Sequence, residues 1–419
     1  MRFFVLFAQA FSVAVLAAPA PYKRQVITHQ GSGQVSGGPA GVSNDNVNNG
    51  VQIDSSLVNG GGPLPGAAAP QDFNPFLMAT PPNTDPNSPV NPFFGGVPGN
   101  TTTVPRIGLG TMGMSAIYGP VNDDESVKVL NHAADIGCTF WDTADVYGGG
   151  HNERLLSRVL KDRRNEVFLS TKFSAVFNKP GPDFDGNIDN IITGVRGDPE
   201  YVHKAVNDSL ERLGVDHIDI YFQHRVDPKV PIEETVKAMA ELVQQGKIRY
   251  IGLSECTEEH LRRAYNVHPI AAVQVEYSPW TTHIETNGLL DACRELGVAV
   301  VAYSPLGRGF MTGQIRKFED LNESDWRRHN PRFKPEHFEN NLKLVDAFGE
   351  IAKKHNCKPG QVALSWLLAQ YEKLIVIPGT RKIKYLEENV EAGQIHLSND
   401  ELRYLREKVN SANIQGERY

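Results

Sequence analysis

Beyond the first hundred residues, short apolar segments recur along the chain, and most of them are followed by a stretch whose apolar residues share one helical face. The stretch 199–213 shows the pattern: charged residues separate apolar positions that repeat every three to four residues, at Val202, Val206, Leu210 and Leu213. This spacing is typical of a helix with one buried face. We therefore expect a regular succession of strands and amphipathic helices.

The pattern predicts eight strands and the helices between them. The predicted strands span residues 107–110, 139–141, 167–171, 218–223, 250–253, 272–275, 298–303 and 374–377. The predicted helices span residues 124–135, 152–161, 199–213, 232–245, 257–267, 287–296, 342–355 together with 359–369, and 382–392. Eight such units in about 320 residues predict a closed parallel (β/α)8 barrel, the TIM barrel. A doubly wound open sheet is the alternative, but no Gly-x-Gly-x-x-Gly sequence follows the first strand.

The N-terminal end of the chain has the layout of a secretory signal peptide. Arg2 precedes an uncharged apolar stretch, residues 3–18, which ends in small residues. The stretch is shorter than the roughly 20 residues that a helix needs to span a bilayer. The dibasic pair Lys23-Arg24 follows it and is similar to a propeptide-processing site. We expect a signal-peptide-like segment over residues 1–18.

A segment of low complexity separates this stretch from the predicted barrel. Residues 25–105 contain no Lys, Arg or Glu and are rich in Gly, Asn, Pro and Ser. Such a composition buries too little apolar surface to offset the entropy of ordering, so we expect a disordered leader over residues 19–102. The barrel domain is expected over 103–419. A mis-joined gene model whose true start lies near Met78 is another interpretation of the leader.

Composition narrows the classes of function. The net charge is −7, and 40% of the residues are hydrophobic, as in ordinary soluble globular proteins. No long basic run is present, so nothing indicates nucleic acid or an anionic membrane as a partner, and no second run could cross a bilayer. The four cysteines are scattered without metal-ligand spacing, and no metal site is predicted. The sequence does not indicate an oligomeric state.

Polar side chains follow three neighbouring predicted strands at their C-terminal ends. Asp142 and Tyr147 follow the second strand, Lys172 follows the third and His224 follows the fourth. Each residue alone has an ordinary structural explanation, such as a turn tyrosine or a surface lysine. In a closed barrel, however, the C-terminal ends of the strands meet at the rim that carries active sites. We therefore expect these four side chains to converge.

The set suits the reduction of a carbonyl group. Hydride transfer to a carbonyl carbon leaves an alkoxide that needs a proton and a stabilising field. Tyr147 can give the proton, although an unperturbed tyrosine pKa of about 10 is high for work near neutral pH. A Lys172 ammonium beside it favours the phenolate, and Asp142 can hold that lysine. His224 can donate a hydrogen bond to the carbonyl oxygen.

These motifs resemble those of the aldo-keto reductases. The sequences Asp-Thr-Ala-x-x-Tyr-Gly, Ser-Thr-Lys at a strand end and a strand-end His match the tetrad of that family. Further matches are Gly108-Leu-Gly-Thr-Met-Gly113, Gly252-Leu-Ser254, Ala302-Tyr-Ser-Pro-Leu-Gly307 and Ile377-Pro-Gly-Thr380. The resemblance implies a TIM-barrel carbonyl reductase in which Tyr147 donates the proton. It is strongest to the fungal and plant branch, which implies small-molecule aldehydes or ketones, aromatic aldehydes or pyridoxal as substrates.

The resemblance also implies a nicotinamide cofactor site that lacks a Rossmann fingerprint, with NADPH favoured over NADH. Ser254 and Gln274 match the residues that bind the carboxamide, and Tyr303 matches the ring that stacks on nicotinamide. The other implied cofactor residues are Gly110, Thr111, Met112, Asp142, Ser304, Leu306, Gly307, Gly379, Thr380, Arg381, Lys382, Lys384, Glu388 and Asn389. A basic cluster beside a helix N-terminus is also a reasonable phosphate site on physical grounds.

Two positions depart from the family pattern. Glu255 stands where many members have Asn after the cofactor serine, so the carboxamide role is not transferred to it. Tyr385 stands where many members have an arginine that binds the 2′-phosphate. The preference for NADPH therefore depends on the three cations Arg381, Lys382 and Lys384.

Two questions stay open on the sequence. A cofactor-binding regulatory subunit, like the potassium-channel β subunits of this fold, is an alternative to an enzyme, because an intact tetrad permits catalysis without requiring it. The location of the protein is the second question, since the barrel favours the cytoplasm whereas the signal-like segment favours the secretory pathway. The particular carbonyl substrate and the stereochemistry of its reduction are not indicated by any motif.

Overall fold

A computed structural model describes residues 90–97, 100–115, 121–177, 192–323 and 325–418. The signal-peptide-like segment and the leader as far as residue 89 lie outside the described residues. No helix in the described part of the chain is long and apolar enough to span a bilayer.

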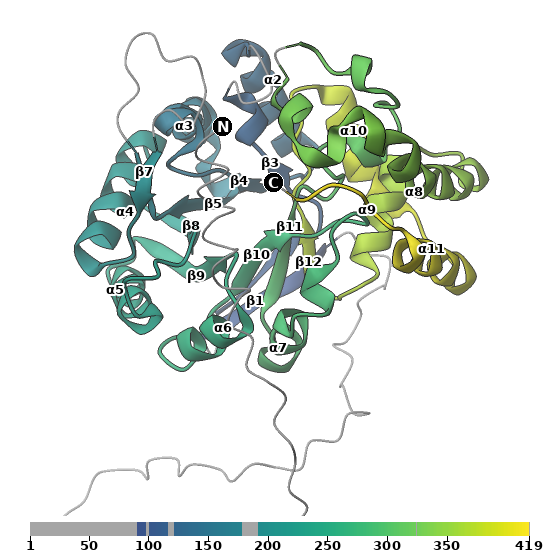
Figure 1. Cartoon of the computed structure of the whole chain (residues 1–419). Coiled ribbons are helices and arrows are strands. Elements are labelled where there is room, and N and C mark those ends of the chain that lie inside the picture. Colours follow the sequence, from purple (N-terminus) through teal and green to yellow (C-terminus); the bar gives the residue numbers. More distant parts are fainter. Residues whose placement is uncertain (1–89, 98–99, 116–120, 178–191, 324, 419) are drawn as a thin grey trace, which may run out of the picture. The chain divides into compact units, whose positions relative to one another are not determined.

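Eight parallel strands form the central sheet (Figure 1). They are β3 (Leu109–Gly110), β4 (Phe140–Asp142), β5 (Phe168–Phe173), β8 (Ile218–Gln223), β9 (Ile248–Ser254), β10 (Ala272–Glu276), β11 (Ala299–Tyr303) and β12 (Leu374–Val376). Each strand pairs with the next central strand along the chain. Parallel bridges from Ile107 to Val376 and from Gly110 to Gly379 join the first strand to the last. The predicted (β/α)8 barrel is therefore confirmed.

The seam between the first and last strands requires a glycine. The Gly108 N–H donates to the Val376 carbonyl at 2.9 Å, and the Gly110 N–H donates to the Pro378 carbonyl at 3.3 Å. A Cβ atom on Gly110 would lie 2.8 Å from the Ile377 carbonyl oxygen, closer than real Cβ atoms come to another atom. Only glycine allows this approach of the two backbones.

Helices surround the strands, as Figure 1 shows. They are α2 (Asp123–Asp135), α3 (His151–Arg163), α4 (Pro199–Leu213), α5 (Ile232–Gln244), α6 (Glu258–Tyr265), α7 (Leu289–Leu296), α8 (Pro335–Lys354), α9 (Pro359–Leu368), α10 (Ile383–Glu391) and α11 (Asn399–Ser411). All predicted helices are present, and α11 is an additional one. The predicted bounds of α4 agree with the structure because its ends carry strong signals: the Asp198 carboxylate accepts from the Tyr201 N–H, and Gly214 ends the helix at a φ of 66°.

Two short hairpins lie outside the barrel sheet. One consists of β1 (Val90–Val97) and β2 (Asn100–Pro105), and the other of β6 (Ala175–Phe177) and β7 (Ile192–Val195). In β2, Val104 is 1% exposed and packs with the side chains inside the barrel.

The first hairpin changes the domain boundary. The boundary expected between residues 102 and 103 falls inside β2, so the folded domain includes residues 90–97 and 100–102. The hydroxyl groups of Thr102 and Tyr250 lie 2.7 Å apart in a hydrogen bond. Pairing with each other satisfies the backbone groups on the facing edges of the two strands, and Val104 adds buried apolar surface, which offsets the ordering entropy of a charge-poor segment.

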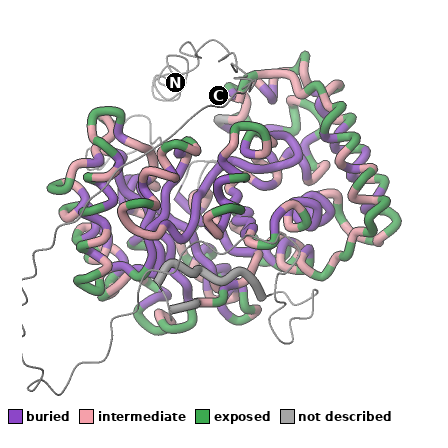
Figure 2. The backbone as a smooth tube through the Cα atoms, turned by 90° about the horizontal axis from the view of Figure 1, so that it is seen from below, coloured by how far each residue is buried: buried purple, intermediate pink, exposed green. Residues whose placement is uncertain are grey.

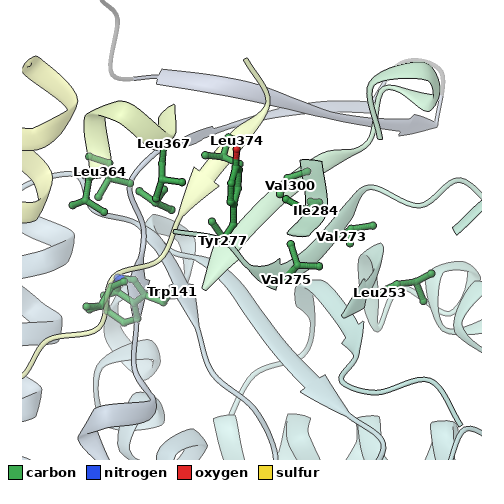
Figure 3. Close-up of a cluster of buried hydrophobic side chains, with 14 of the residues drawn as sticks. Trp141, Leu253, Val273, Val275, Tyr277, Ile284, Val300, Leu364, Leu367 and Leu374 are labelled. Carbon is green, nitrogen blue, oxygen red and sulfur yellow. The ribbon is translucent and has the colours of Figure 1, made fainter. Parts of the chain in front are cut away.

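Side chains of the strands alternate between two apolar clusters. Outward side chains pack under the helices, as Figure 3 shows for Leu374 of β12 beside Leu367 of α9. Inward side chains, such as Ile220 and Phe222 of β8, fill the barrel. Figure 2 shows that buried residues concentrate in the strands and on the inner sides of the helices. At the C-terminal ends of the strands, the inward-facing side chains are polar, and the candidate site lies there.

Candidate active site

The period of two along each strand points one set of polar side chains into the mouth of the barrel. Asp142 of β4 pairs in register with Ser170 of β5, and Ser254 of β9 pairs with Gln274 of β10. Lys172 lies two residues after Ser170 and therefore on the same inward face. Residues from separate sequence motifs therefore lie at the same end of the barrel.

Lys172 is the centre of the predicted tetrad. Its side chain is completely buried. The Nζ atom donates to Asp142 Oδ2 at 2.6 Å, to the Thr143 carbonyl at 2.7 Å and to the Tyr147 hydroxyl at 3.3 Å. Burial by itself lowers the pKa of Lys172, but the charge of Asp142 and then the interaction with Tyr147 raise that pKa above its usual value. The lysine therefore stays an ammonium ion although it is buried.

Asp142 is held by a set of donors around its carboxylate. Oδ1 accepts from the Ser170 hydroxyl at 2.7 Å and from Gln274 Nε2 at 2.8 Å, while Oδ2 accepts from Lys172. These bonds satisfy the carboxylate in a place where a charge without partners would be very costly. The orientation of Asp142, and through it that of Lys172, is fixed by donors from the two strands β5 and β10.

Tyr147 lies just after β4, at the start of the short helix η2 (Tyr147–Gly150). Its ring contacts the His224 ring edge-on, with centroids 6.0 Å apart. Lys172 Nζ lies 4.9 Å from the centre of the Tyr147 ring. Burial raises the pKa of Tyr147 above its usual value, and the ammonium of Lys172 opposes this rise. At neutral pH the phenol therefore carries its proton and can donate it.

His224 follows β8 and completes the group. Burial, with help from the charges of Arg225 and Lys172, holds the pKa of His224 well below its usual range. The imidazole is therefore neutral at physiological pH and has one N–H to donate. All four predicted catalytic side chains lie together, as the sequence predicted.

The three residues implied for nicotinamide lie on the next strands of the barrel. Ser254 is 1% exposed, and its hydroxyl has no hydrogen-bond partner among the described residues. Such a buried hydroxyl suits a ligand amide, because a buried polar group without a partner is costly. Gln274 donates to Asp142, and the Tyr303 hydroxyl donates to Glu255 Oε1 at 2.8 Å. The donors present therefore fit a carboxamide beside the tetrad.

The implied phosphate-binding residues occupy the neighbouring ends of β11 and β12. Ser304 and Gly307 take left-handed backbone angles, with φ of 48° and 55°, in the turn after β11. The helix α10 begins after Lys382 without a side-chain cap, so its first N–H groups are available to a ligand. The other residues of this set are Leu306, Gly379, Thr380 and Arg381 along the same rim and Lys384 in the first turn of α10. The same helix carries Glu388 and Asn389, which the resemblance implies for adenine.

The three residues after β3 that the resemblance implies for the cofactor differ in burial and in their contacts. Gly110 lies at the barrel seam. Thr111 is fully buried, and its hydroxyl lies within hydrogen-bond distance of the Asp142 carbonyl at 2.8 Å and of Asn152 Oδ1 at 2.6 Å. Met112 begins the short helix η1 (Met112–Met114) and is half-buried. Thr111 thus supports the β3–β4 end of the site through its hydrogen bonds.

Sequence reasoning missed several residues that the structure places here. Ser170 and the Thr143 carbonyl, which hold Asp142 and Lys172, belong to motifs that the sequence contains and could have been found there. Arg225 adds a second positive charge, which helps burial to lower the pKa of His224 and opposes the rise of the pKa of Tyr147. Arg418 reaches Tyr303 from far along the chain, and no local pattern indicates this.

The part of the chain that the structure describes contains no cluster of His, Cys, Asp and Glu side chains suited to a metal ion. The chemistry that this arrangement of residues supports is a proton transfer from Tyr147 beside a fixed cation, with a neutral imidazole as a further donor.

Comparison with known proteins identifies the family of the chain. Residues 106–410 match the model of the aldo/keto reductase family. The chain is 50% identical to the aldo-keto reductase str7 of Strobilurus tenacellus over 325 residues, covering 75% of this chain and 92% of the relative. It is 46% identical to the aldo-keto reductase yakc [NADP(+)] of Schizosaccharomyces pombe over 321 residues, covering 76% and 92%.

A solved structure supports the same conclusion. An aldo/keto reductase from Klebsiella pneumoniae, crystallised with NADP and acetate, superposes with a TM-score of 0.57 at 27% identity and covers 73% of this chain and 92% of its own. Together with the match over residues 106–410, the fold and the site show that this chain belongs to the aldo/keto reductase family and is an oxidoreductase.

Proposed function

We propose that this protein reduces aldehydes or ketones to alcohols with NADPH and that Tyr147 is the proton donor. One observation carries the proposal: the buried Lys172 ammonium lies between Asp142, at 2.6 Å, and the Tyr147 hydroxyl, at 3.3 Å. An ammonium in this position stabilises the phenolate that remains when the phenol gives up its proton.

The cofactor fits the residues that line the mouth of the barrel. Ser254 and Gln274 would hold the carboxamide, Tyr303 would stack on the ring, and the cations around α10 would hold phosphate groups. NADPH, when bound, supplies the hydride for the carbonyl carbon. The NADP named for the yeast relative and for the Klebsiella pneumoniae structure supports this choice.

The residues of the chain divide the remaining work. Tyr147 donates its proton to the carbonyl oxygen as negative charge develops there. Lys172 stabilises the phenolate, and Asp142 keeps Lys172 charged and in place. His224, neutral because of its surroundings, donates a hydrogen bond that orients the carbonyl oxygen. A contact or a charge within the site supports each of these roles.

Substitution of Tyr147 by Phe tests the proposal. The variant keeps the ring but loses the proton, so kcat for NADPH oxidation with an aromatic aldehyde should fall by roughly 10² to 10⁴-fold. The Kd for NADPH, measured by fluorescence titration, should stay unchanged. The matched control is Tyr404→Phe on α11, which removes a surface hydroxyl that donates to Glu350 of α8. A Tyr147→Phe variant as active as the wild type would overturn the assignment of Tyr147 as proton donor. Absence of turnover in the wild type itself would favour the regulatory-subunit interpretation.

A further inference from the structure

The last described residues, 412–418, follow α11 and lie against the mouth of the barrel. Figure 1 shows this yellow segment running from α11 to the barrel opening. The side chain of Arg418 there contacts residues at the ends of three consecutive strands: Glu255 after β9, Glu276 of β10 and Tyr303 of β11. Tyr303 is the residue that would stack on nicotinamide.

Polar side chains that are buried hold this segment in place. Asn341 accepts from the Gln415 N–H at 2.9 Å and donates to the Gln415 carbonyl at 3.0 Å. Asn330 Nδ2 donates to the Arg418 carbonyl at 3.1 Å. Asn341 and Asn330 are 0% and 3% exposed. Buried amides of this kind would lose partners if the segment left, so its docked position is specified by the fold.

The Arg418 guanidinium is bound by two carboxylates. Nε donates to Glu276 Oε2 at 2.6 Å, and the two Nη atoms donate to the oxygens of Glu255 at 2.7 and 3.2 Å. Glu276 is also paired with Arg308 at 3.0 Å. The charge of Arg332 also acts on Glu276 and that of Arg225 on Glu255, while Arg418 hydrogen-bonds to both carboxylates. The planar guanidinium suits such a fork of hydrogen bonds.

The Tyr303 hydroxyl lies inside this network. It donates to Glu255 Oε1 at 2.8 Å and accepts from Arg418 Nη2 at 2.7 Å. Glu255 Oε1 also accepts from the Glu276 N–H at 3.1 Å, and the Glu255 backbone has a left-handed φ of 50°. Glu255 is the residue at which the sequence departs from the family's usual Asn. Here its carboxylate and Arg418 together hold the far end of the Tyr303 ring.

We propose that Arg418 and Glu255 are positioning residues that hold the Tyr303 ring ready to stack on nicotinamide, so that segment 412–418 is a working part of the cofactor site. This inference rests on the proposed cofactor site. A tyrosine whose hydroxyl is held at two points loses less rotational freedom when it stacks than a tyrosine that can turn. Tight binding of nicotinamide then depends on a residue that lies 115 positions along the chain from Tyr303.

The test is the Kd for NADPH, measured by fluorescence titration of the full chain without any carbonyl substrate. Arg418→Ala should raise this Kd about tenfold, whereas the neighbouring exposed Glu417→Ala should leave it within about twofold of the wild type. In a Tyr303→Phe background, which keeps the ring but lacks the hydroxyl, adding Arg418→Ala should raise the Kd by less than about threefold. A purely structural role of Arg418 would not depend on that hydroxyl.

A second variant covers the case in which Arg418→Ala does not fold. Glu255→Gln with Arg418→Met removes one charge of each sign and leaves the Arg308–Glu276 pair intact. It should also raise the Kd about tenfold. Wild-type affinity in this double variant, or an Arg418→Ala effect equally large with and without the Tyr303 hydroxyl, would overturn the inference. A chain that binds NADPH but reduces no carbonyl would refute the proposed function while these Kd values still decide the role of Arg418.

Discussion

At the scale of single residues, burial shifts the pKa values of two neighbouring side chains, Tyr147 and His224, in opposite directions. It raises the pKa of Tyr147 and lowers that of His224, because a buried site disfavours the charged form of each. Both side chains are therefore neutral near pH 7, and both can donate a hydrogen. The only charged groups of the tetrad are then Lys172 and Asp142, which neutralise each other at 2.6 Å.

These shifts predict the pH dependence of carbonyl reduction. Since the pKa of His224 lies well below 6.5, its imidazole does not gain a proton when the pH falls to about 6, and kcat/KM should stay constant from about pH 8 to about pH 6. Since the pKa of Tyr147 is raised above 10, activity should fall on the alkaline side only above about pH 10, where the phenol loses its proton. A pH–rate profile with a loss of activity centred near 6.5 that disappears in His224→Gln would contradict this assignment.

At the scale of elements, the residues proposed to hold the cofactor lie mostly at strand ends and in the first turn of one helix. The helix α10 starts without a side-chain cap, and Lys382 and Lys384 are exposed beside its first turn. Uncapped N–H groups and nearby cations together favour a phosphate group. Because the two lysines are exposed, their effect on an anion is moderate and is screened by salt.

The double variant Lys382→Ala/Lys384→Ala tests this element. We expect the Kd for NADPH to rise about tenfold at low ionic strength, because the 2′-phosphate loses two nearby charges. The Kd for NADH, which lacks that phosphate, should stay nearly unchanged. Lys161→Ala on the exposed surface of α3 is the control, since its side chain is 69% exposed. Equal weakening of NADPH and NADH would show that the two lysines do not contact the 2′-phosphate.

At the scale of the whole molecule, a buried ion pair joins the layers next to the site. Glu153 of α3 is completely buried, accepts from the Thr171 hydroxyl of β5 at 2.7 Å and pairs with Arg212 of α4 at 2.6 Å. Burial raises the pKa of Glu153, and the charge of Arg212 opposes that rise. The pair therefore connects two helices to the strand that carries Lys172.

Removal of the Arg212 guanidinium should destabilise the whole barrel. Arg212→Ala leaves a buried carboxylate without its partner and should reduce the free energy of unfolding by about 3 kcal/mol. A carboxyl with a raised pKa binds more protons in the folded state, so the loss should be larger at about pH 8 than at about pH 5. Chemical denaturation at both pH values measures the effect.

Two variants serve as controls for this prediction. Lys204→Ala, on the exposed face of the same helix, should change stability by no more than about 0.5 kcal/mol. Glu153→Gln with Arg212→Met removes both charges and should regain much of the lost stability. If Arg212→Ala were as stable as the wild type at both pH values, Glu153 would not depend on this partner.

Not every element could be predicted from the chain. The helix α11 begins with a capping box between Ser398 and Glu401, a signal that the sequence contains. Its apolar stripe is weak, however, because only Leu405 and Val409 of this helix are buried. The strand β1 and residues 100–102 of β2 fall within the expected leader because they share its charge-poor composition. Their order comes from pairing with each other and from Val104 inside the barrel.

The sequence by itself determined the strand–helix succession and the tetrad. Both depend on local patterns: a period of two or 3.6, and polar residues placed directly after strands. Once eight parallel strands close, their C-terminal ends must meet, so Asp142, Lys172 and His224 come together without further information.

Only the tertiary structure decided the contacts that join distant segments. The Arg418 network brings together residues 115 to 163 positions apart in sequence. The pKa values of Tyr147 and His224 likewise depend on what surrounds them in the barrel. Charge pairing and burial depend on distances between atoms in space. A sequence pattern indicates which residues are neighbours only within one helix or one strand.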